Sequence, residues 1–401
     1  MDFSLNHHPV VNVTKLLCGP AQAADGPRHG EGECAPKRAP QRKPVVVWNI
    51  TRRCNQRCAH CYVDSTSQHC PGELTLQQCI DVIDDLADYQ VPGVLLSGGE
   101  PTLHPDFFDL VGYGIARGLR VTVTTNGTRI DSHAAQRLKD LGVTHVGISL
   151  DGIGEHHDKF CGRTGAFQKA VDAFRHCRGA GQKVGMRLIL TRQTADQLSQ
   201  ILRFIEEEDI PRVCFSHLAH SGRGADLKLL PASETRAVLR MIGDAVLRWN
   251  REGNRREVLT MDQPADGVFF WLTMRRKNPK RAEEIWKLLS SNGHHASGLG
   301  IANIDSQGDV HPDQFWHSHK LGNVKERPFS RIWSNAQNDD LLTGLRDRLP
   351  RLQGRCADCR FKKICGGGFR VRAFHKYGNP WAEDPGCYLR DYEIAHAEAS
   401  V

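Results

Sequence analysis

Short β-branched runs alternate with amphipathic helical patterns between residues 45 and 225, and this alternation limits the possible folds most strongly. Parallel strands need a crossover of about a dozen residues or more, and helices of this length supply it. Six such units predict an α/β fold, an open or partial (β/α)6 barrel of the TIM type, with its chemistry at the C-terminal ends of the strands. The runs are VVVWNIT, VPGVLLSGG, LRVTVTTNG, VTHVGISLDG, KVGMRLILT and PRVCFSHLA.

Three further regions flank the predicted barrel of residues 45–225. Residues 1–44 are rich in Pro, Gly and charged residues, which predicts a flexible leader. Residues 226–300 show mainly helical patterns and predict a helical linker region. Residues 301–401 begin with short Gly-rich segments and end in a cysteine-rich tail, which predicts a second unit.

Composition narrows the classes of function. The chain has no run of eighteen or more apolar residues and no secretory signal pattern, so we expect a cytoplasmic protein without membrane contact. Fourteen cysteines in such a chain indicate metal or redox chemistry rather than a disulfide framework. The net charge of +7 comes from dispersed Lys and Arg. This argues against nucleic acid and suits an anionic small molecule, although solubility alone would also explain it.

The stretch TRRCNQRCAHCYVDS places Cys54, Cys58 and Cys61 directly after the first strand. A structural zinc site normally has four ligands and a disulfide has two. Three thiolates can hold three corners of a [4Fe–4S] cube and leave the fourth iron open. The alternatives are a partial zinc site and chance clustering.

A C-x3-C-x2-C loop in this position resembles the radical S-adenosylmethionine (SAM) superfamily, and so does LSGGEP at the end of the second strand. The resemblance implies that backbone groups of the GGE motif receive the methionine ammonium of SAM. It also implies SAM contacts at the ends of the later strands. Asn126 and Asp151 there have the alternative role of capping turns. The implied SAM-binding residues are Tyr62, Gly98, Gly99, Glu100, Thr124, Ser149 and Arg187.

The resemblance also implies an activity. In this superfamily an electron from the cluster cleaves SAM, and the resulting 5′-deoxyadenosyl radical abstracts a hydrogen from the substrate. We therefore expect an electron donor of the flavodoxin or ferredoxin type, and a monomer. The non-enzymatic alternative is an Fe–S or zinc-binding scaffold, which should show a damaged SAM pocket. Both the cysteine triplet and GGEP are present.

The tail supplies a second cysteine set, Cys356, Cys359, Cys365 and Cys387. Four thiolates fit structural zinc equally well in isolation. Beside a radical SAM core, however, the tail resembles the SPASM-type domain, which holds auxiliary Fe–S clusters. Phe369 stands where the full pattern has a cysteine, and residues 301–324 contain none. We therefore expect one auxiliary [4Fe–4S] cluster, and two clusters in total.

Several stretches together resemble the radical SAM enzymes of haem d1 biosynthesis. That branch implies an iron-tetrapyrrole substrate, 12,18-didecarboxysirohaem, with a radical reaction at its propionate side chains. The alternatives are a sister enzyme of another haem pathway and a peptide maturase of the SPASM type. The stretches are VVVWNITRRCNQRCAHCY, PADGVFFW, ANIDSQGDVHPDQFW, LGNVKERPFSRIW and CGGGFRVRAFHKYGNPWAEDPGCYL.

The segment VHPDQFWHSHK adds possible substrate contacts at His311, His317 and His319. Imidazole can ligate haem iron, and a cluster lost from this segment is expected to leave space for a flat macrocycle. The alternative is surface or turn histidines. The remaining cysteines are scattered, and those in apolar patterns predict core packing. These are Cys79, Cys177 and Cys214, whereas Cys18, Cys34, Cys70 and Cys161 suggest no role.

Overall fold

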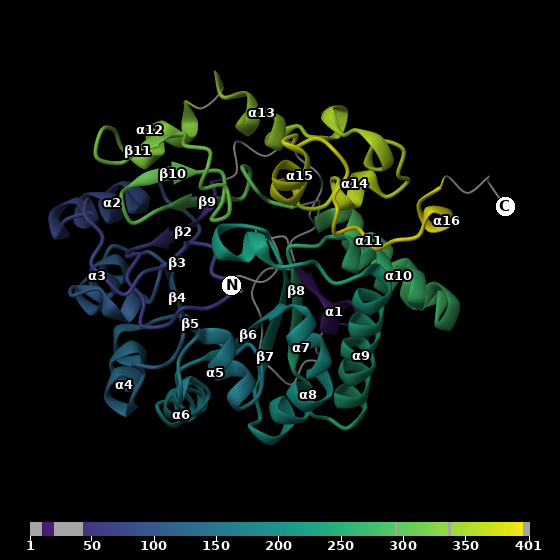
Figure 1. The fold of residues 1–401 in the computed structure, drawn as a ribbon, viewed down its shortest axis with the longest axis horizontal. Helices are drawn as coiled ribbons and strands as arrows, with labels where there is room; N and C mark the ends of the chain where they lie inside the picture. The colour runs from purple at the N-terminus through teal and green to yellow at the C-terminus, as the bar shows by residue number, and fades with distance from the viewer. Residues whose placement is uncertain (1–9, 20–42, 293–294, 336–337, 396–401) are drawn as a thin grey trace.

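The computed structural model describes residues 10–19, 43–292, 295–335 and 338–395. Its centre is a run of six neighbouring parallel strands, with the connecting helices on the outside (Figure 1). This confirms the predicted partial barrel. The strands are β2 (Val45–Asn49), β3 (Val94–Ser97), β4 (Val121–Thr125), β5 (His145–Ser149), β6 (Val184–Leu190) and β7 (Arg212–His217).

Three of the connecting helices, α2, α4 and α7, begin at residues whose side chains cap them. Thr75 and Gln78 form a capping box at the start of α2, and Asp131 caps α4, which ends at the left-handed Gly142. One face of each amphipathic helix packs on the sheet. The helices are α2 (Leu76–Asp88), α3 (Phe107–Ala116), α4 (Ser132–Leu141), α5 (Glu155–Cys161), α6 (Ala166–Gly179), α7 (Arg192–Asp196) and α8 (Leu198–Glu207).

Strands from both ends of the chain extend the barrel sheet. At one edge, β8 (Glu257–Met261) pairs in parallel with β7, and β1 (Val10–Asn12) pairs antiparallel with β8. At the other edge, β9 (Ile301–Ile304) pairs in parallel with β2. The sheet then continues through β10 (Asp309–His311) and β11 (Gly322–Asn323). The C-terminal region is therefore hydrogen-bonded to the strand that carries the three-cysteine loop.

Two of the expected regions contain elements that the sequence did not predict. Residues 10–18 fall in the expected leader but form β1 and α1 (Val13–Cys18), with Val13 and Leu16 buried in the main core. The short apolar run VVNVTKLL was obscured by the polar, Pro-rich residues that follow it. Residues 1–9 and 20–42, including Cys34, lie outside the described part. The expected linker 226–300 contains β8, so it completes the sheet.

Helices after β7 surround the open edge of the barrel and support the tail. Arg236 on α9 pairs with Glu393 on α16 through two contacts of 2.8 Å, both partners being buried. No helix among the described residues is long and apolar enough to span a bilayer. The remaining helices are α9 (Ala232–Arg251), α10 (Ala265–Lys277), α11 (Pro279–Asn292), α12 (Phe329–Ser334), α13 (Asp340–Arg346), α14 (Lys362–Cys365), α15 (Arg370–Tyr377) and α16 (Asp391–Ile394).

The burial of α1 yields a test of its contribution to stability. The Leu16 side chain is 3% exposed, so replacing it with Ala leaves a cavity in the core. We expect Leu16→Ala to lower the unfolding free energy by roughly 2–4 kcal/mol. Met241→Ala on the exposed side of α9 is the control and should change stability little. Denaturant unfolding followed by circular dichroism measures both. Equal stability of Leu16→Ala and wild type would contradict the packing of α1.

Candidate active site

Two glycines at the end of β3 hold the cysteine loop against the barrel. A Cβ atom on Gly98 would lie 2.4 Å from the Thr51 carbonyl oxygen, and one on Gly99 would lie 2.2 Å from that of Arg53. The Gly99 N–H donates to the Thr51 oxygen (2.7 Å), and the Glu100 N–H donates to the Arg53 oxygen (2.8 Å). Only glycine permits this approach. The N–H groups of the GGE motif therefore bind the loop itself.

The Glu100 carboxylate also has a structural role. It is fully buried and accepts hydrogen bonds from the hydroxyls of Thr102 and Thr125 and from the Asn126 N–H, all at 2.7 Å. Burial raises the pKa of this carboxyl, although these hydrogen bonds act in the opposite direction. The side chain ties β3 to the end of β4, so only backbone groups of the motif remain for a ligand.

The three thiols of the loop lie in an environment suited to a bound cation. Burial raises the pKa of Cys54 to about 12, and the N–H groups of Gln56 and Ser65 donate to Cys54 Sγ and Cys61 Sγ (3.4 Å each). Buried thiolates need a strong positive charge nearby, which iron supplies. In the described part of the chain, no three Cys, His, Asp or Glu side chains converge on one point as a single metal ion requires. The corners of an iron–sulfur cube lie farther apart.

The inner face of the barrel mouth is polar. Side chains alternate along a strand, and Trp48, Leu96, Val123, Ile148, Met186 and Leu188 belong to the core under the helices. The neighbouring positions therefore face inward, and they include every side chain that the sequence predicted to contact SAM from a strand. These inward residues are Asn49, Ser97, Thr124, Ser149 and Arg187. Asn49 and Ser97 were not predicted as site residues from the sequence. They lie two positions after Val47 and Leu95, so the alternation of side chains along each strand places them on the same face.

Tyr62 covers this inner face. Its hydroxyl donates to Asn49 Oδ1 (3.0 Å) and lies 3.2 Å from Ser97 Oγ, and burial raises its pKa to about 12. The ring also contacts the C-terminal region, with Phe315 at 5.3 Å and His317 at 6.0 Å between ring centroids. The aromatic residue after the cysteine triplet thus joins the loop, the barrel and the second unit.

Arg187 and Thr124 form a polar position deeper in the mouth. A Cβ on Gly147 would lie 2.9 Å from Arg187 Cδ and 3.8 Å from Thr124 Oγ1. The Arg187 side chain therefore passes over Gly147, where a larger residue would block it. Thr124 Oγ1 and Asn49 Nδ2 are buried and have no hydrogen-bond partner. Buried polar atoms normally have one. These two atoms and the Arg187 guanidinium suit a ligand with hydroxyl and carboxylate groups, as SAM has.

Asn126 fits the turn-capping alternative, because it bonds the backbone two residues on, whereas Asp151 bonds the neighbouring strand β6. Asn126 Oδ1 accepts from the Thr128 N–H (3.0 Å), and Asp151 Oδ1 accepts from the Ile189 N–H (2.7 Å). Both contacts join backbone segments at the strand ends. Asn126 Nδ2 additionally lies 3.9 Å from Cys54 Sγ, which places a donor beside the cysteine loop.

The four tail cysteines line one pocket, which also contains Gln263, Arg355 and Asp384. Burial is the largest cause of the raised pKa of each thiol, and the other cysteines of the set add to it. Arg355 donates to Cys387 Sγ (3.1 Å). The glycines at 366–368 all have positive φ (60°, 79° and 76°), which lets the chain turn sharply after Cys365. The geometry fits a closed four-thiolate site.

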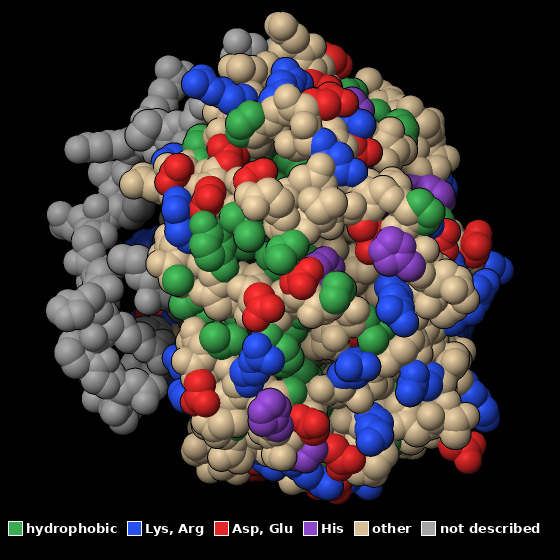
Figure 2. Space-filling model, turned by 90° about the vertical axis from the view of Figure 1, so that its left-hand side faces the viewer, with side chains coloured by type: hydrophobic (Ala, Val, Ile, Leu, Met, Phe, Trp, Pro, Cys, Tyr) green, Lys and Arg blue, Asp and Glu red, His purple; other side chains and the backbone are tan. Residues whose placement is uncertain are grey.

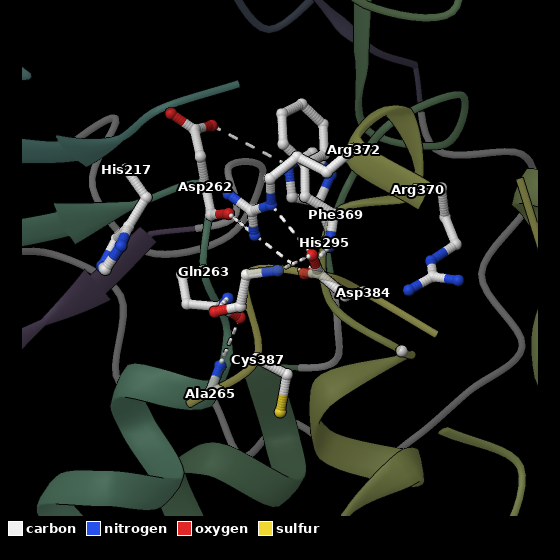
Figure 3. Close-up of polar contacts among 12 residues, drawn as sticks. His217, Asp262, Gln263, Ala265, His295, Phe369, Arg370, Arg372, Asp384 and Cys387 are labelled. Atoms are coloured by element: carbon white, nitrogen blue, oxygen red, sulfur yellow. Dashed lines mark hydrogen bonds and ion pairs between the residues drawn. The ribbon is translucent and has the colours of Figure 1, made fainter. Parts of the chain in front are cut away.

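A buried ion pair connects this pocket to the barrel (Figure 3). Arg372 on α15 contacts both oxygens of Asp384 (2.9 and 2.8 Å) and donates to the carbonyl oxygens of Leu218 and Asp262, at the ends of β7 and β8. Burial alone would raise the pKa of Asp384, but Arg372 outweighs it and holds that pKa at about 2. Gln263 adds a bond to the Gly386 carbonyl (2.8 Å).

The surroundings of Phe369 are closely packed. Phe369 is fully buried, stacks on His295 (4.2 Å between centroids) and packs edge-on against Phe315. Trp316 and Leu345 complete this small apolar core. Aromatic and apolar side chains therefore occupy the position where the full pattern has a cysteine, and space for a macrocycle elsewhere beside residues 301–324 stays a prediction.

The three histidines of the same segment separate into different environments. His319 Nε2 pairs with Asp339 (2.8 Å), and His311 Nδ1 bonds the His319 carbonyl oxygen (2.8 Å). His317 alone stacks on Tyr62, with its Nε2 buried and unpartnered. Burial lowers the pKa of His317 to about 4, so the ring is neutral near pH 7. Of the three rings, that of His317 contacts Tyr62, and the His311 ring packs edge-on against the His317 ring. The predicted core cysteines Cys79, Cys177 and Cys214 are buried in apolar clusters, as expected.

Comparisons with known proteins agree with this site. Residues 48–205 match the radical SAM superfamily, and residues 297–360 match the SPASM iron–sulfur cluster-binding domain. The chain belongs to the radical SAM enzymes with a SPASM domain. This membership implies SAM and Fe–S clusters as cofactors.

Among its relatives, the chain is 41% identical to the Fe-coproporphyrin III synthase of Methanosarcina barkeri, over 97% of this chain and 100% of that protein. It is 40% identical to the pre-heme d1 synthase of Dinoroseobacter shibae, over 88% of each chain. Of the solved structures, Streptococcus suis SuiB bound to S-adenosylmethionine superposes with a TM-score of 0.67. That match covers 87% of this chain and 78% of SuiB at 19% identity, so it shows the fold.

The contact between Gly147 and Arg187 predicts a specific loss of SAM affinity. Gly147→Ala should push Arg187 aside and weaken SAM binding about tenfold, the effect of losing roughly one charged hydrogen bond. Iron content should stay unchanged. Gly179→Ala, where a Cβ meets nothing within 4 Å, is the matched control. Anaerobic equilibrium dialysis with labelled SAM measures both, and wild-type affinity in Gly147→Ala would contradict the placement of Arg187.

The tail pocket predicts the iron content. Reconstituted wild type should carry roughly eight irons, from two four-iron clusters. Cys365→Ala should lose the tail cluster and keep roughly four irons, because the loop cysteines are untouched. Cys214→Ala, which removes a buried thiol of β7 outside both cysteine sets, should keep the full content. Iron near four with stoichiometric zinc in the wild type would support the structural-zinc alternative instead.

Proposed function

We propose that this protein is a radical SAM enzyme that modifies carboxylate side chains of an iron tetrapyrrole, with 12,18-didecarboxysirohaem as substrate. The observation that carries the proposal is similarity at 40–41% identity, over 88% and 100% of their lengths, to two enzymes named for iron-tetrapyrrole products. The intact cysteine loop and the unpartnered polar atoms of the barrel mouth support a working SAM site. A scaffold without activity would need neither an intact cysteine loop nor unpartnered polar atoms in the barrel mouth.

Within this proposal, each part of the chain has a definite task. Cys54, Cys58 and Cys61 hold a [4Fe–4S] cluster, which with SAM supplies a 5′-deoxyadenosyl radical for hydrogen abstraction. Arg187 pairs with the SAM carboxylate, and Thr124 and Ser149 bind its polar groups. Tyr62 closes the mouth and excludes water. A flavodoxin- or ferredoxin-type protein supplies the electron.

The tail cysteines hold a single auxiliary cluster, which can accept an electron from the substrate radical. Arg372 and Asp384 support this role, because they fix the Cys387 loop rigidly to the ends of β7 and β8. The four thiols line one pocket, and the SPASM domain match favours an iron–sulfur cluster over a zinc ion there.

Two products compete. In the haem d1 route, propionate side chains are removed. The second candidate is Fe-coproporphyrin III, which by its chemical definition keeps its propionates, and the relative that matches over its full length favours it. Anaerobic incubation with didecarboxysirohaem, SAM and a reductant, followed by mass spectrometry, separates the two products. Absence of any SAM-dependent product while 5′-deoxyadenosine still forms would favour the peptide-maturase alternative.

The position of His317 predicts a spectroscopic signature of substrate binding. If its unpartnered Nε2 ligates the substrate iron, adding didecarboxysirohaem should shift the Soret band, and His317→Ala should remove the shift. His319→Ala is the matched control, because that ring is held by Asp339, and it should retain the shift. Failure of the wild type to bind any iron tetrapyrrole at micromolar concentration would overturn the substrate assignment and leave the cluster assignment intact.

A further inference from the structure

The end of α5 is hydrogen-bonded to the cysteine loop on both sides of Cys58. The Arg57 N–H donates to the Cys161 carbonyl oxygen (2.8 Å), and the Ala59 N–H donates to that of Phe160 (3.0 Å). The Cys161 side chain is 1% exposed, and its interaction with the neighbouring Cys58 thiol raises its pKa. Cys161, which suggested no role in the sequence, is therefore a direct neighbour of a proposed cluster ligand.

His157 sets the direction of the hydrogen bonds around Cys161. The Asp151 backbone N–H can only donate, and it lies 2.9 Å from His157 Nδ1, so Nδ1 must carry the lone pair. In the neutral ring the proton then sits on Nε2, which lies 3.5 Å from Cys161 Sγ. Burial lowers the pKa of His157, which agrees with a neutral ring. His157 therefore donates to Cys161 Sγ and leaves the Cys161 proton free for another acceptor.

We propose that Cys161, oriented by His157, donates a hydrogen bond to the Cys58 ligand and raises the reduction potential of the SAM-binding cluster. The inference rests on the proposed function, since Cys58 must hold that cluster. The reduced cluster carries one more negative charge than the oxidised one, so a donor to a ligand sulfur stabilises the reduced form more. Cys161 and His157 are positioning residues, because they act through Cys58.

The chain Asp151–His157–Cys161–Cys58 is rigid as well as directed. Asp151 is anchored by the Ile189 N–H at the end of β6, and α5 is bonded to the loop through its backbone. Each donor is buried, so water does not compete for the ligand sulfur. The barrel thereby presents a fixed donor to one corner of the cluster.

The test uses full-length, anaerobically reconstituted protein and a potentiometric titration followed by electron paramagnetic resonance. The signal that changes on adding SAM identifies the relevant cluster. Cys161→Ala should make its midpoint more negative by about 59 mV, which corresponds to a tenfold lower ratio of reduced to oxidised cluster at a fixed potential. Cys161→Ser keeps a donor and should stay closer to wild type.

The control is Cys177→Ala, which removes a fully buried thiol from α6 and should leave the midpoint unchanged. An unchanged midpoint in Cys161→Ala, with full iron content, overturns the inference. If that variant loses its iron, the Cys161→Ser and His157→Phe variants decide: a negative shift in His157→Phe alone supports the inference, and a wild-type midpoint in both opposes it. A wild type without any SAM-responsive signal would instead refute the proposed function.

Discussion

The close backbone approach of β3 to the cysteine loop is the contact on which the site depends. Gly98 and Gly99 bring the end of β3 within hydrogen-bond distance of the carbonyl oxygens of Thr51 and Arg53, where no larger residue fits. The loop is thereby fixed just before Cys54, and Glu100 extends the same support to β4. The GGE motif thus has a structural role, because its N–H groups hold the cysteine loop. A ligand must bind the backbone groups of the motif that are not used in this way.

The barrel could be predicted because its signal is local and repeated. Strands of four to seven residues with β-branched side chains alternate with amphipathic helices, so hydrophobic pattern and local propensity both predict the same fold. The cysteine sets could be located for a similar reason, since their spacing is short. β1 and α1 could not, because a single strand and one short helix are stabilised only by distant partners such as α9 and β8. Their sequence lies beside a polar stretch that dominates the composition.

Side-chain placement within the site was less predictable than its position in the chain. The inward face of each strand follows from the alternation of side chains, so Thr124, Ser149 and Arg187 share that face, and their contact with SAM stays a prediction. Contacts between distant segments do not follow from any local pattern. The approach of Cys161 to Cys58 and the stacking of His317 on Tyr62 arise from three-dimensional packing alone. The packing around Phe369 was also not predictable from a local pattern. The sequence shows that a cysteine is replaced there, but not which side chains pack around the replacement.

The two cysteine sets both offer thiols to a metal cluster but differ in whether they leave a position for another ligand. The loop set supplies three thiols and stands beside inward polar groups that have no protein partner, which leaves room for an exchangeable ligand. The tail set supplies four thiols around one pocket and needs no further ligand. Burial raises the pKa of thiols in both sets, so each set must release protons when it binds a cluster, and the positive metal repays the cost of the buried thiolates. Arg372 and Asp384 link the tail pocket to the ends of β7 and β8, so both cysteine sets are attached to the same barrel.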